Sequence, residues 1–203
     1  MTGGVAGVAG VATPARVGPN AVLQMAAALA AEGGPDFAAR IFDRAGLADL
    51  LAAPPKSMVA EDIAARLHRT VIAEMAPERA SCIARSAGRR TADYLLAHRI
   101  PGPAQRLLKA LPPRWAAQLL LLAIRRSAWT FAGSGRFRAC SGNPSVIEIV
   151  DNPLAVPGCP WHAAVFERLF RVLVSPATVV VETDCCARNA GACRFEIWLS
   201  GRG

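Results

Sequence analysis

The residues of this sequence best suited to bind a metal ion are three cysteines and one glutamate near its carboxyl end. Cys159, Glu182, Cys185 and Cys193 follow one another with 22, 2 and 7 residues between them. Zinc favours four tetrahedral thiolate, imidazole or carboxylate ligands at about 2.0–2.3 Å, whereas a hard, oxygen-preferring ion would not choose such a set. Four protein ligands leave no open position for water or substrate, so we expect a structural zinc site.

Two neighbouring side chains leave alternatives open for this site. Cys186 is adjacent to Cys185, so both cannot easily reach one ion, and one of them is expected to be a bystander. His162 lies about one helical turn after Cys159 and is a rival ligand. A histidine in an apolar helix is more often packed in the core, and the spacing alone does not decide between these sets.

The composition limits the class of protein. The chain has 203 residues, 53% of them apolar, which is enough to bury a core in one domain or in two closely packed halves. Six cysteines are too few for a secreted disulfide scaffold, and we expect Cys82 and Cys140 to be small buried residues. No signal peptide is recognisable, and the longest apolar run, residues 115–124, falls short of the ~18 residues that cross a bilayer. We expect a cytoplasmic protein.

The formal net charge of +8 suits an anionic partner: nucleic acid, a membrane surface or a carboxylate-bearing molecule. Nearly all the positive charge is arginine, scattered from Arg16 to Arg202, and only 6% of the residues are aromatic. A nucleic-acid platform with interleaved aromatic residues is therefore not expected. Arginine can grip a carboxylate with two parallel hydrogen bonds, so the charge favours a small acidic ligand, with peripheral membrane association also open.

The elements that would position these residues divide the chain near residue 127. Residues 1–18 are interpreted as a flexible tail, and residues 19–126 as a helical region. Proline at helix starts and glycine after helix ends predict helices over residues 21–32, 36–45, 77–99 and 113–126. A further helix is predicted after an N-cap at Ser57, up to about Met75, and a short one between the proline breaks at 101 and 113.

Residues 127–203 have the pattern of strands around one helix. Two short strands are predicted around the Gly-Ser-Gly turn within residues 128–142, and others over 145–150, 177–183 and 193–200. A helix is predicted over 159–174. The fold class is therefore α+β, with an N-terminal helical layer packed on an antiparallel sheet that has one inserted helix and is closed by a zinc-bearing hairpin. We expect both regions to form one compact unit.

The segments GCPWHAAVFERLF and VVVETDCCARNAGACRFEI resemble the 4-vinyl-reductase domain, a small ligand-binding module that also occurs in bacterial phenol-sensing activators and archaeal proteins. The resemblance covers roughly residues 137–199 and assigns a ligand-binding domain to residues 127–203. In the phenol sensors, zinc is held by Cys, Glu, Cys and Cys at the spacing found here. The resemblance thus implies that Cys159, Glu182, Cys185 and Cys193 hold the zinc ion.

Over its whole length, including RVGPNAVLQMAAAL, the chain resembles the bacteriochlorophyll 4-vinyl reductase family of bacteriochlorophyll biosynthesis. That family is placed at the reduction of the 4-vinyl (8-vinyl) group of divinyl protochlorophyllide or chlorophyllide. The resemblance implies a protein that binds a tetrapyrrole intermediate as an accessory or carrier, works with other enzymes of the pathway, and by analogy with related modules forms a homodimer. The alternatives are the vinyl reductase itself and a small-molecule sensor module.

The sequence leaves open whether the protein is an enzyme, because a reductase needs a hydride source. A nucleotide-binding turn of the doubly wound type lies between a strand and a helix, so that the helix N-terminus can bind the pyrophosphate. The glycine-rich stretch TGGVAGVAG follows no predicted strand, and AGSGRF is followed by a predicted strand rather than a helix. Neither stretch predicts a nicotinamide site.

A tetrapyrrole pocket needs apolar walls and a cation that faces the pigment carboxylate. Aromatic residues within or near the resembling segment could supply the walls, and arginines close to them could supply the cation. Ordinary core packing is the alternative for each aromatic side chain. The candidates are Trp129, Phe131, Phe137, Phe166 and Phe170 for the walls, and Arg125, Arg126 and Arg136 for the cation.

Overall fold

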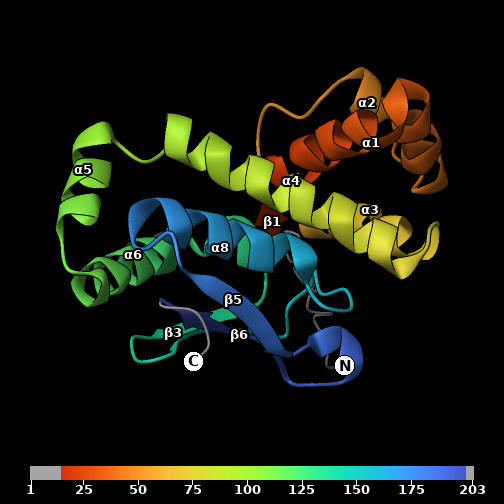
Figure 1. Cartoon of the computed structure of the whole chain (residues 1–203). Coiled ribbons are helices and arrows are strands. Elements are labelled where there is room, and N and C mark those ends of the chain that lie inside the picture. The colour runs from red at the N-terminus through yellow and green to blue at the C-terminus, as the bar shows by residue number, and fades with distance from the viewer. Residues whose placement is uncertain (1–14, 200–203) are drawn as a thin grey trace, which may run out of the picture.

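The computed structural model describes residues 15–199, in which helices lie over one face of a sheet (Figure 1). The helices are α1 (Asn20–Arg44), α2 (Ala48–Ala52), α3 (Glu61–Ala73), α4 (Pro77–His98), α5 (Gly102–Ala110), α6 (Pro113–Ser127), α7 (Trp129–Ala132) and α8 (Pro160–Leu173). The strands are β1 (Arg16–Val17), β2 (Val59–Ala60), β3 (Arg136–Cys140), β4 (Ser145–Val150), β5 (Val179–Asp184) and β6 (Ala192–Trp198). This arrangement agrees with the predicted α+β class.

The last four strands form one antiparallel sheet in the order β3-β4-β6-β5. Buried and partly exposed residues alternate along β4 and β6, so one face of the sheet is turned to the core. The β5–β6 pairing changes register between Glu182 and Asp184, and such an irregularity bends the strand locally. The end of β5 therefore leaves the regular sheet where the candidate ligands begin.

Helix α8 lies between the N-terminal helices and the sheet (Figure 1). On one side Trp161 donates a hydrogen bond to Thr91 of α4 at 3.2 Å, and on the other the ring of Phe166 packs on Phe195 of β6 at 5.3 Å. The first seven residues of α8 are all buried. The helical layer and the sheet thus meet largely through this inserted helix, and one core cluster contains side chains from both predicted regions.

The α4–α8 contact depends on a small residue. A Cβ atom at Gly88 of α4 would lie 2.4 Å from the carbonyl oxygen of Trp161 and 2.8 Å from the Cβ of Ala164. Both distances are shorter than van der Waals contact, so only glycine allows the two helices to approach this closely. Gly88 thereby sets the position of α8 over the sheet.

The break predicted between the helices over 21–32 and 36–45 is present within α1 as a kink at Gly34, whose φ of 82° is left-handed. Other element predictions were wrong at their boundaries. Ser57 caps no helix, because Val59 and Ala60 pair with residues 16–17 and α3 begins only at Glu61. The same pairing places part of the predicted tail, residues 16–17, in β1, while residues 1–14 lie outside the described part of the chain.

The segment that follows α6 is also different from the prediction. Residues 129–132 form the short helix α7 rather than a strand, because the backbone stays helical through Ala128, at φ −58° and ψ −33°. The β-favouring residues there do not overcome this continuation. Helix α2 was not predicted. Within residues 15–199, no helix has both the length and the apolar character needed to traverse a bilayer.

Candidate metal centre and the α6 groove

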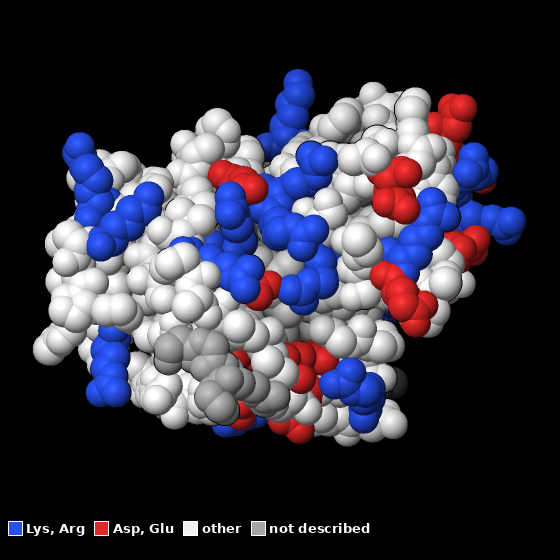
Figure 2. All heavy atoms as spheres, viewed as in Figure 1, with Lys and Arg blue, Asp and Glu red and all other residues white. Residues whose placement is uncertain are grey.

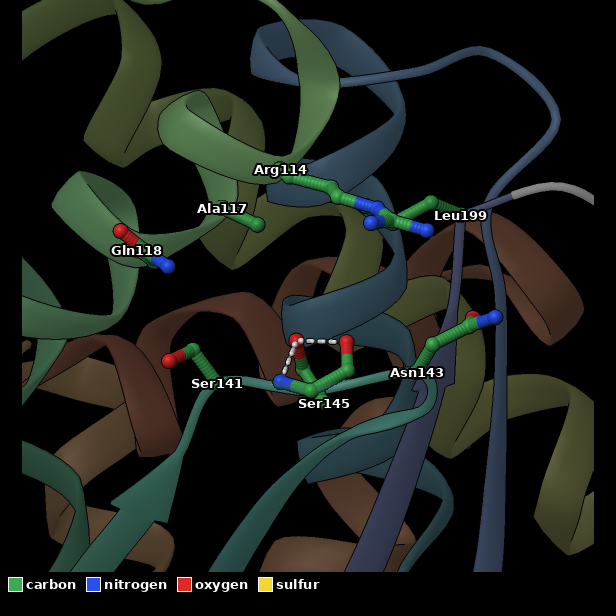
Figure 3. A pocket seen from close by; sticks show the side chains of 8 residues that line it. Arg114, Ala117, Gln118, Ser141, Asn143, Ser145 and Leu199 are labelled. Atoms are coloured by element: carbon green, nitrogen blue, oxygen red, sulfur yellow. Dashed lines mark hydrogen bonds between the residues drawn. The ribbon is translucent and has the colours of Figure 1, made fainter.

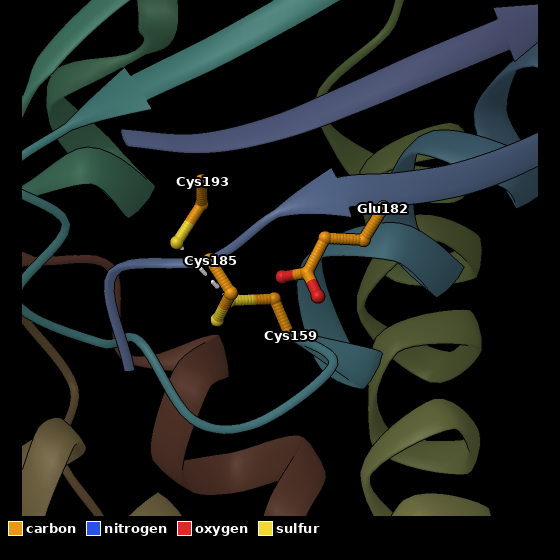
Figure 4. Close-up of side chains that lie close together, drawn as sticks. All are labelled: Cys159, Glu182, Cys185 and Cys193. Carbon is orange, nitrogen blue, oxygen red and sulfur yellow. Dashed lines mark hydrogen bonds between the residues drawn. The ribbon is translucent and has the colours of Figure 1, made fainter. Parts of the chain in front are cut away.

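The four predicted ligands meet at one end of the β5–β6 hairpin (Figure 4). Cys159 directly precedes α8 and has a left-handed φ of 36°, Glu182 belongs to β5, and Cys193 belongs to β6. Cys185 follows the last residue of β5. The side chains point toward one another, and the three thiols are buried. The hairpin and the start of α8 therefore contribute to a single cluster.

The distances in this cluster fit a small metal ion. The Sγ atom of Cys159 is 3.4 Å from that of Cys193 and 3.8 Å from that of Cys185. All four ligand atoms lie within 4.8 Å of one another. A tetrahedral zinc ion with zinc–sulfur bonds of about 2.3 Å would hold its sulfur atoms about 3.8 Å apart. The cluster could therefore hold one metal ion.

The two oxygen atoms of the Glu182 carboxylate have different surroundings. Arg188 donates a hydrogen bond to its Oε2 atom at 2.8 Å, and the Glu182 side chain is only 5% exposed. Among the described residues, no hydrogen-bond partner of normal geometry reaches its buried Oε1 atom. A buried carboxylate oxygen without a partner is costly, and a bound cation would satisfy it.

Several donors converge on the sulfur of Cys193. The Nδ2 atom of Asn152 lies 3.3 Å away, the backbone N–H of Cys186 3.4 Å away, and the thiol of Cys159 3.4 Å away. The hydrogen bond from Cys159 is the main cause that lowers the pKa of Cys193 to about 6 and raises the pKa of Cys159. These contacts favour a thiolate at Cys193, the form that binds metal.

The rival ligands lie outside the cluster. The Cys186 thiol donates toward the carbonyl oxygen of Ile149 at 3.9 Å and lines a separate cleft of about 400 Å³ beside Arg69. The ring of His162 is buried against Trp161, with centroids 4.8 Å apart, and burial lowers the pKa of His162 to about 3. His162 is thus a packed core residue rather than a member of this group.

The prediction that Cys82 and Cys140 are buried was wrong, because both are exposed. The buried positions near the start of α4 are Ala80, Ile83 and Ala84, which leaves residue 82 on the outer side of the helix. Cys140 ends β3, an edge strand in which alternate residues face solvent.

The structure brings three of the five aromatic candidates for the pigment pocket, Phe131, Phe137 and Phe166, into contact with one another. Phe166 and Phe170 are 1% and 0% exposed and pack in the core, which was the alternative to a pocket role for each aromatic residue. Phe131 and Phe137 are half-buried and contact each other edge to face at 5.6 Å, and Phe131 also contacts Phe166 edge to face at 5.8 Å. Trp129 is 61% exposed.

The three candidate arginines have different surroundings. Arg126 is exposed, and Arg136 pairs with Asp151 at 3.3 Å on the surface. Arg125 lines a cleft of about 150 Å³ between α6 and β3. The remaining candidates do not line the three clefts along α6 or the cleft beside Arg69.

The larger opening, which the sequence did not indicate, runs along α6. A cleft of about 280 Å³ lies between α6 and the β3–β4 turn, and an adjoining cleft of about 510 Å³ extends to the start of α6 and shares Arg114 and Leu199 with it (Figure 3). The smaller cleft beside Arg125 shares Gln118 and Ser141 with the first. We call these three adjoining clefts the α6 groove. Its walls include Pro112, Pro113, Arg114, Trp115, Ala117, Gln118, Leu121, Leu122, Arg125, Ala139, Ser141, Gly142, Asn143, Ser145, Ser175, Ala177 and Leu199.

The fold and the site define an α+β protein with a cluster of three thiols and one carboxylate at one end of the sheet and a groove with mixed apolar and basic walls at the other. No protein-family model matches the chain. Two curated proteins named bacteriochlorophyll synthase 23 kDa chain are similar to it. That of Cereibacter sphaeroides is 47% identical over 92% of both chains, and that of Rhodobacter capsulatus is 39% identical over 92% of this chain and 89% of its own. The chain belongs to this family of bacteriochlorophyll biosynthesis proteins.

Proposed function

We propose that this protein binds a tetrapyrrole intermediate of bacteriochlorophyll biosynthesis, of the protochlorophyllide or chlorophyllide type, as an accessory or carrier. The observation that carries the proposal is the α6 groove, in a chain whose relatives are named for bacteriochlorophyll synthesis. A pigment precursor is a flat, mostly apolar ring system with carboxylate substituents. It needs apolar contact over the ring and a cation at the edge.

The groove offers both kinds of contact. Trp115 supplies an aromatic wall at one end, with Ala117 and Leu199 along it. Arg114 extends from α6 across to Leu199, and Arg125 lies in the adjoining cleft (Figure 3). Since arginine binds carboxylates with paired hydrogen bonds, Arg114 is the residue we assign to a pigment carboxylate. The cleft of about 510 Å³ is in the size range of small-molecule sites, and its junction with the two smaller clefts suits an elongated or flat ligand.

We propose that the metal in the cluster is zinc and that its role is structural. Three thiolates and one carboxylate complete a tetrahedral shell and leave no position for substrate. The unpartnered Oε1 atom of Glu182 and the donors around Cys193 support this assignment. Bound there, the ion would pin the β5–β6 hairpin to the start of α8.

The names of the relatives describe one chain of a synthase, which supports a role beside other bacteriochlorophyll biosynthesis enzymes. In this role the protein would present its pigment to a catalytic partner. The alternative, reduction of the vinyl group by this chain, requires a hydride donor. Incubation of the purified protein with divinyl chlorophyllide and NADPH tests it, since product formed without added partners would establish an enzyme.

The carrier proposal is tested by titration of the protein with chlorophyllide, followed by the Soret band and by tryptophan fluorescence. We expect a band shift and quenching, and Arg114→Gln should weaken binding about fivefold, as expected for a partly solvated ion pair. The methyl ester of the same pigment, which lacks the carboxylate charge, should bind the wild type and Arg114→Gln equally. No spectral change with any precursor would rule out the carrier role.

A further inference from the structure

Helix α6 has large apolar side chains on two faces. One face packs in the core through residues such as Ala117, Leu120 and Leu121. The other is exposed to solvent. Across α5, α6 and α7, the described residues include five large apolar side chains that are at least 44% exposed, and we call them the apolar ridge: Leu107, Trp115, Leu119, Leu122 and Trp129.

The spacing of the four ridge residues on α6 and α7 places them on one side. Trp115, Leu119 and Leu122 are four and three residues apart on α6, which is the repeat of one helix face. Trp129 follows seven residues after Leu122, through a backbone that stays helical at Ala128. Leu107 belongs to α5, which contacts α6. A continuous exposed apolar face of this kind marks an interaction surface.

The charge around this ridge is one-sided. Between Asp93 and Glu148 the chain has no acidic residue but eight Arg or Lys residues. The other 15 basic residues equal in number all 15 acidic residues of the chain, so the net charge of +8 resides in this segment. Arginines occur along the whole chain, whereas acidic residues are missing between residues 93 and 148. In Figure 2 the basic side chains over α5 have no acidic side chain beside them on the face shown.

We infer that the apolar ridge docks the protein on the surface of a membrane that contains anionic lipids. Tryptophans favour the boundary between headgroups and acyl chains, and leucines gain from burial below it. Arg126, four residues after Leu122 on α6, is exposed on the ridge face of the helix and would face lipid phosphates. A second copy of the chain is the less favoured occupant, because two such segments would bring eight positive charges against eight others.

The ridge adjoins the α6 groove, although docking on a membrane does not require a bound pigment. Trp115 and Leu122 belong to the ridge and also line clefts of the α6 groove. Leu119 belongs to the ridge but lines none of the three clefts of the α6 groove. Docking would therefore bring the groove to the lipid boundary, where an apolar pigment can be exchanged.

The test is flotation of the full chain, without pigment, with vesicles of phosphatidylcholine alone or mixed with phosphatidylglycerol. We expect binding to the anionic vesicles that falls steeply with added salt and a blue shift of tryptophan fluorescence. Leu119→Glu with Leu122→Glu should weaken binding about a hundredfold, from the loss of two buried leucines. Arg126→Gln should weaken it about fivefold, from the one charge removed.

The matched control for the glutamate pair is Ala31→Glu with Ala39→Glu, at exposed positions of α1, which adds the same charge away from the ridge. It should lower binding far less than the ridge variant, and circular dichroism should show both variants folded. Three outcomes would overturn the inference. They are no flotation of the wild type at low salt, equal losses in both glutamate variants, or a dimer that only the ridge variant dissociates.

Discussion

Arg188 holds one oxygen of the Glu182 carboxylate at 2.8 Å and leaves the other buried without a hydrogen bond of normal geometry within the described chain. The arginine thus fixes the orientation of the carboxylate beside the three thiols. A charged side chain that is otherwise 5% exposed would be costly without such a partner. This ion pair therefore orients a candidate metal ligand, and it would support the proposed zinc site.

Replacement of a ligand should remove the metal. The purified wild-type protein should contain about one zinc ion per chain, and Cys193→Ser should lose it together with about 3 kcal/mol or more of folding stability, because metal-binding energy enters folding directly. For a chain of this size the loss corresponds to a Tm about 6–12 °C lower. Elemental analysis and thermal melts check the result. Cys186→Ser is the control and should be almost silent, since its thiol points to Ile149.

Residues that orient the ligands should tune metal affinity without abolishing it. Asn152→Ala removes the donor to Cys193 and the acceptor for the backbone N–H of Leu154, and Arg188→Gln releases the Glu182 carboxylate. Each change should weaken zinc binding about 10- to 100-fold. Competition with a chromophoric chelator measures the effect. Unchanged affinity in both variants would show that the cluster does not bind metal in this arrangement.

Gly88→Ala should destabilise the protein through the α4–α8 contact. The added methyl group would overlap the carbonyl of Trp161 and the side chain of Ala164, at an expected cost of about 1–3 kcal/mol. The matched control is Gly102→Ala at the start of α5, where a Cβ atom would meet no atom within 4 Å. Urea denaturation should separate the two variants. Equal stability would mean that the helices can move apart at no cost.

Acid should destabilise the fold through buried histidine. His68 is 2% exposed, its Nε2 atom lies 3.0 Å from the carbonyl oxygen of Ala21, and burial lowers its pKa to about 4. The unfolded chain, in which a histidine has its ordinary pKa of about 6.5, then binds more protons as pH falls from about 6.5 to 4. Between pH 7 and pH 5, the protonation of this one residue in the unfolded chain should lower the free energy of unfolding by about 2 kcal/mol.

The pH effect is measured as the difference between the wild type and His68→Gln in urea denaturation at pH 7 and pH 5. Loss of metal in acid affects both proteins, so the difference isolates the histidine. The variant should be less stable at pH 7 but lose less stability on acidification. The same slope in both proteins would contradict neutral burial of His68.

Local signals in the sequence predicted the elements with clear ends. Pro77 and Pro113 begin α4 and α6 as expected, and the β-branched run at 145–150 matches β4. The two-residue strands β1 and β2 escaped notice because their pairing joins residues more than 40 positions apart. Residues 129–132 were misassigned because a continuing helix overrode their β propensity.

For the site, the spacing and the family resemblance together predicted the four side chains that the structure gathers, while metal binding itself stays a prediction. Asn152 and Arg188 carry no signal in the sequence, because their roles depend on hydrogen bonds formed only after folding. The α6 groove was missed for a similar reason. Its walls come from α6, the β3–β4 turn and Leu199, which lie far apart in the chain.

The position of α8 between α4 and the sheet has a consequence for how the molecule opens. Amide protons exchange with solvent only when their hydrogen bonds break, and exchange is slowest in elements covered on all sides. The amides of residues 163–170 should therefore exchange only through global unfolding, while those of the exposed α5 exchange through local fluctuations. Since Cys159 joins this helix to the thiol cluster, the cluster lies at the end of the unit that we expect to open most slowly.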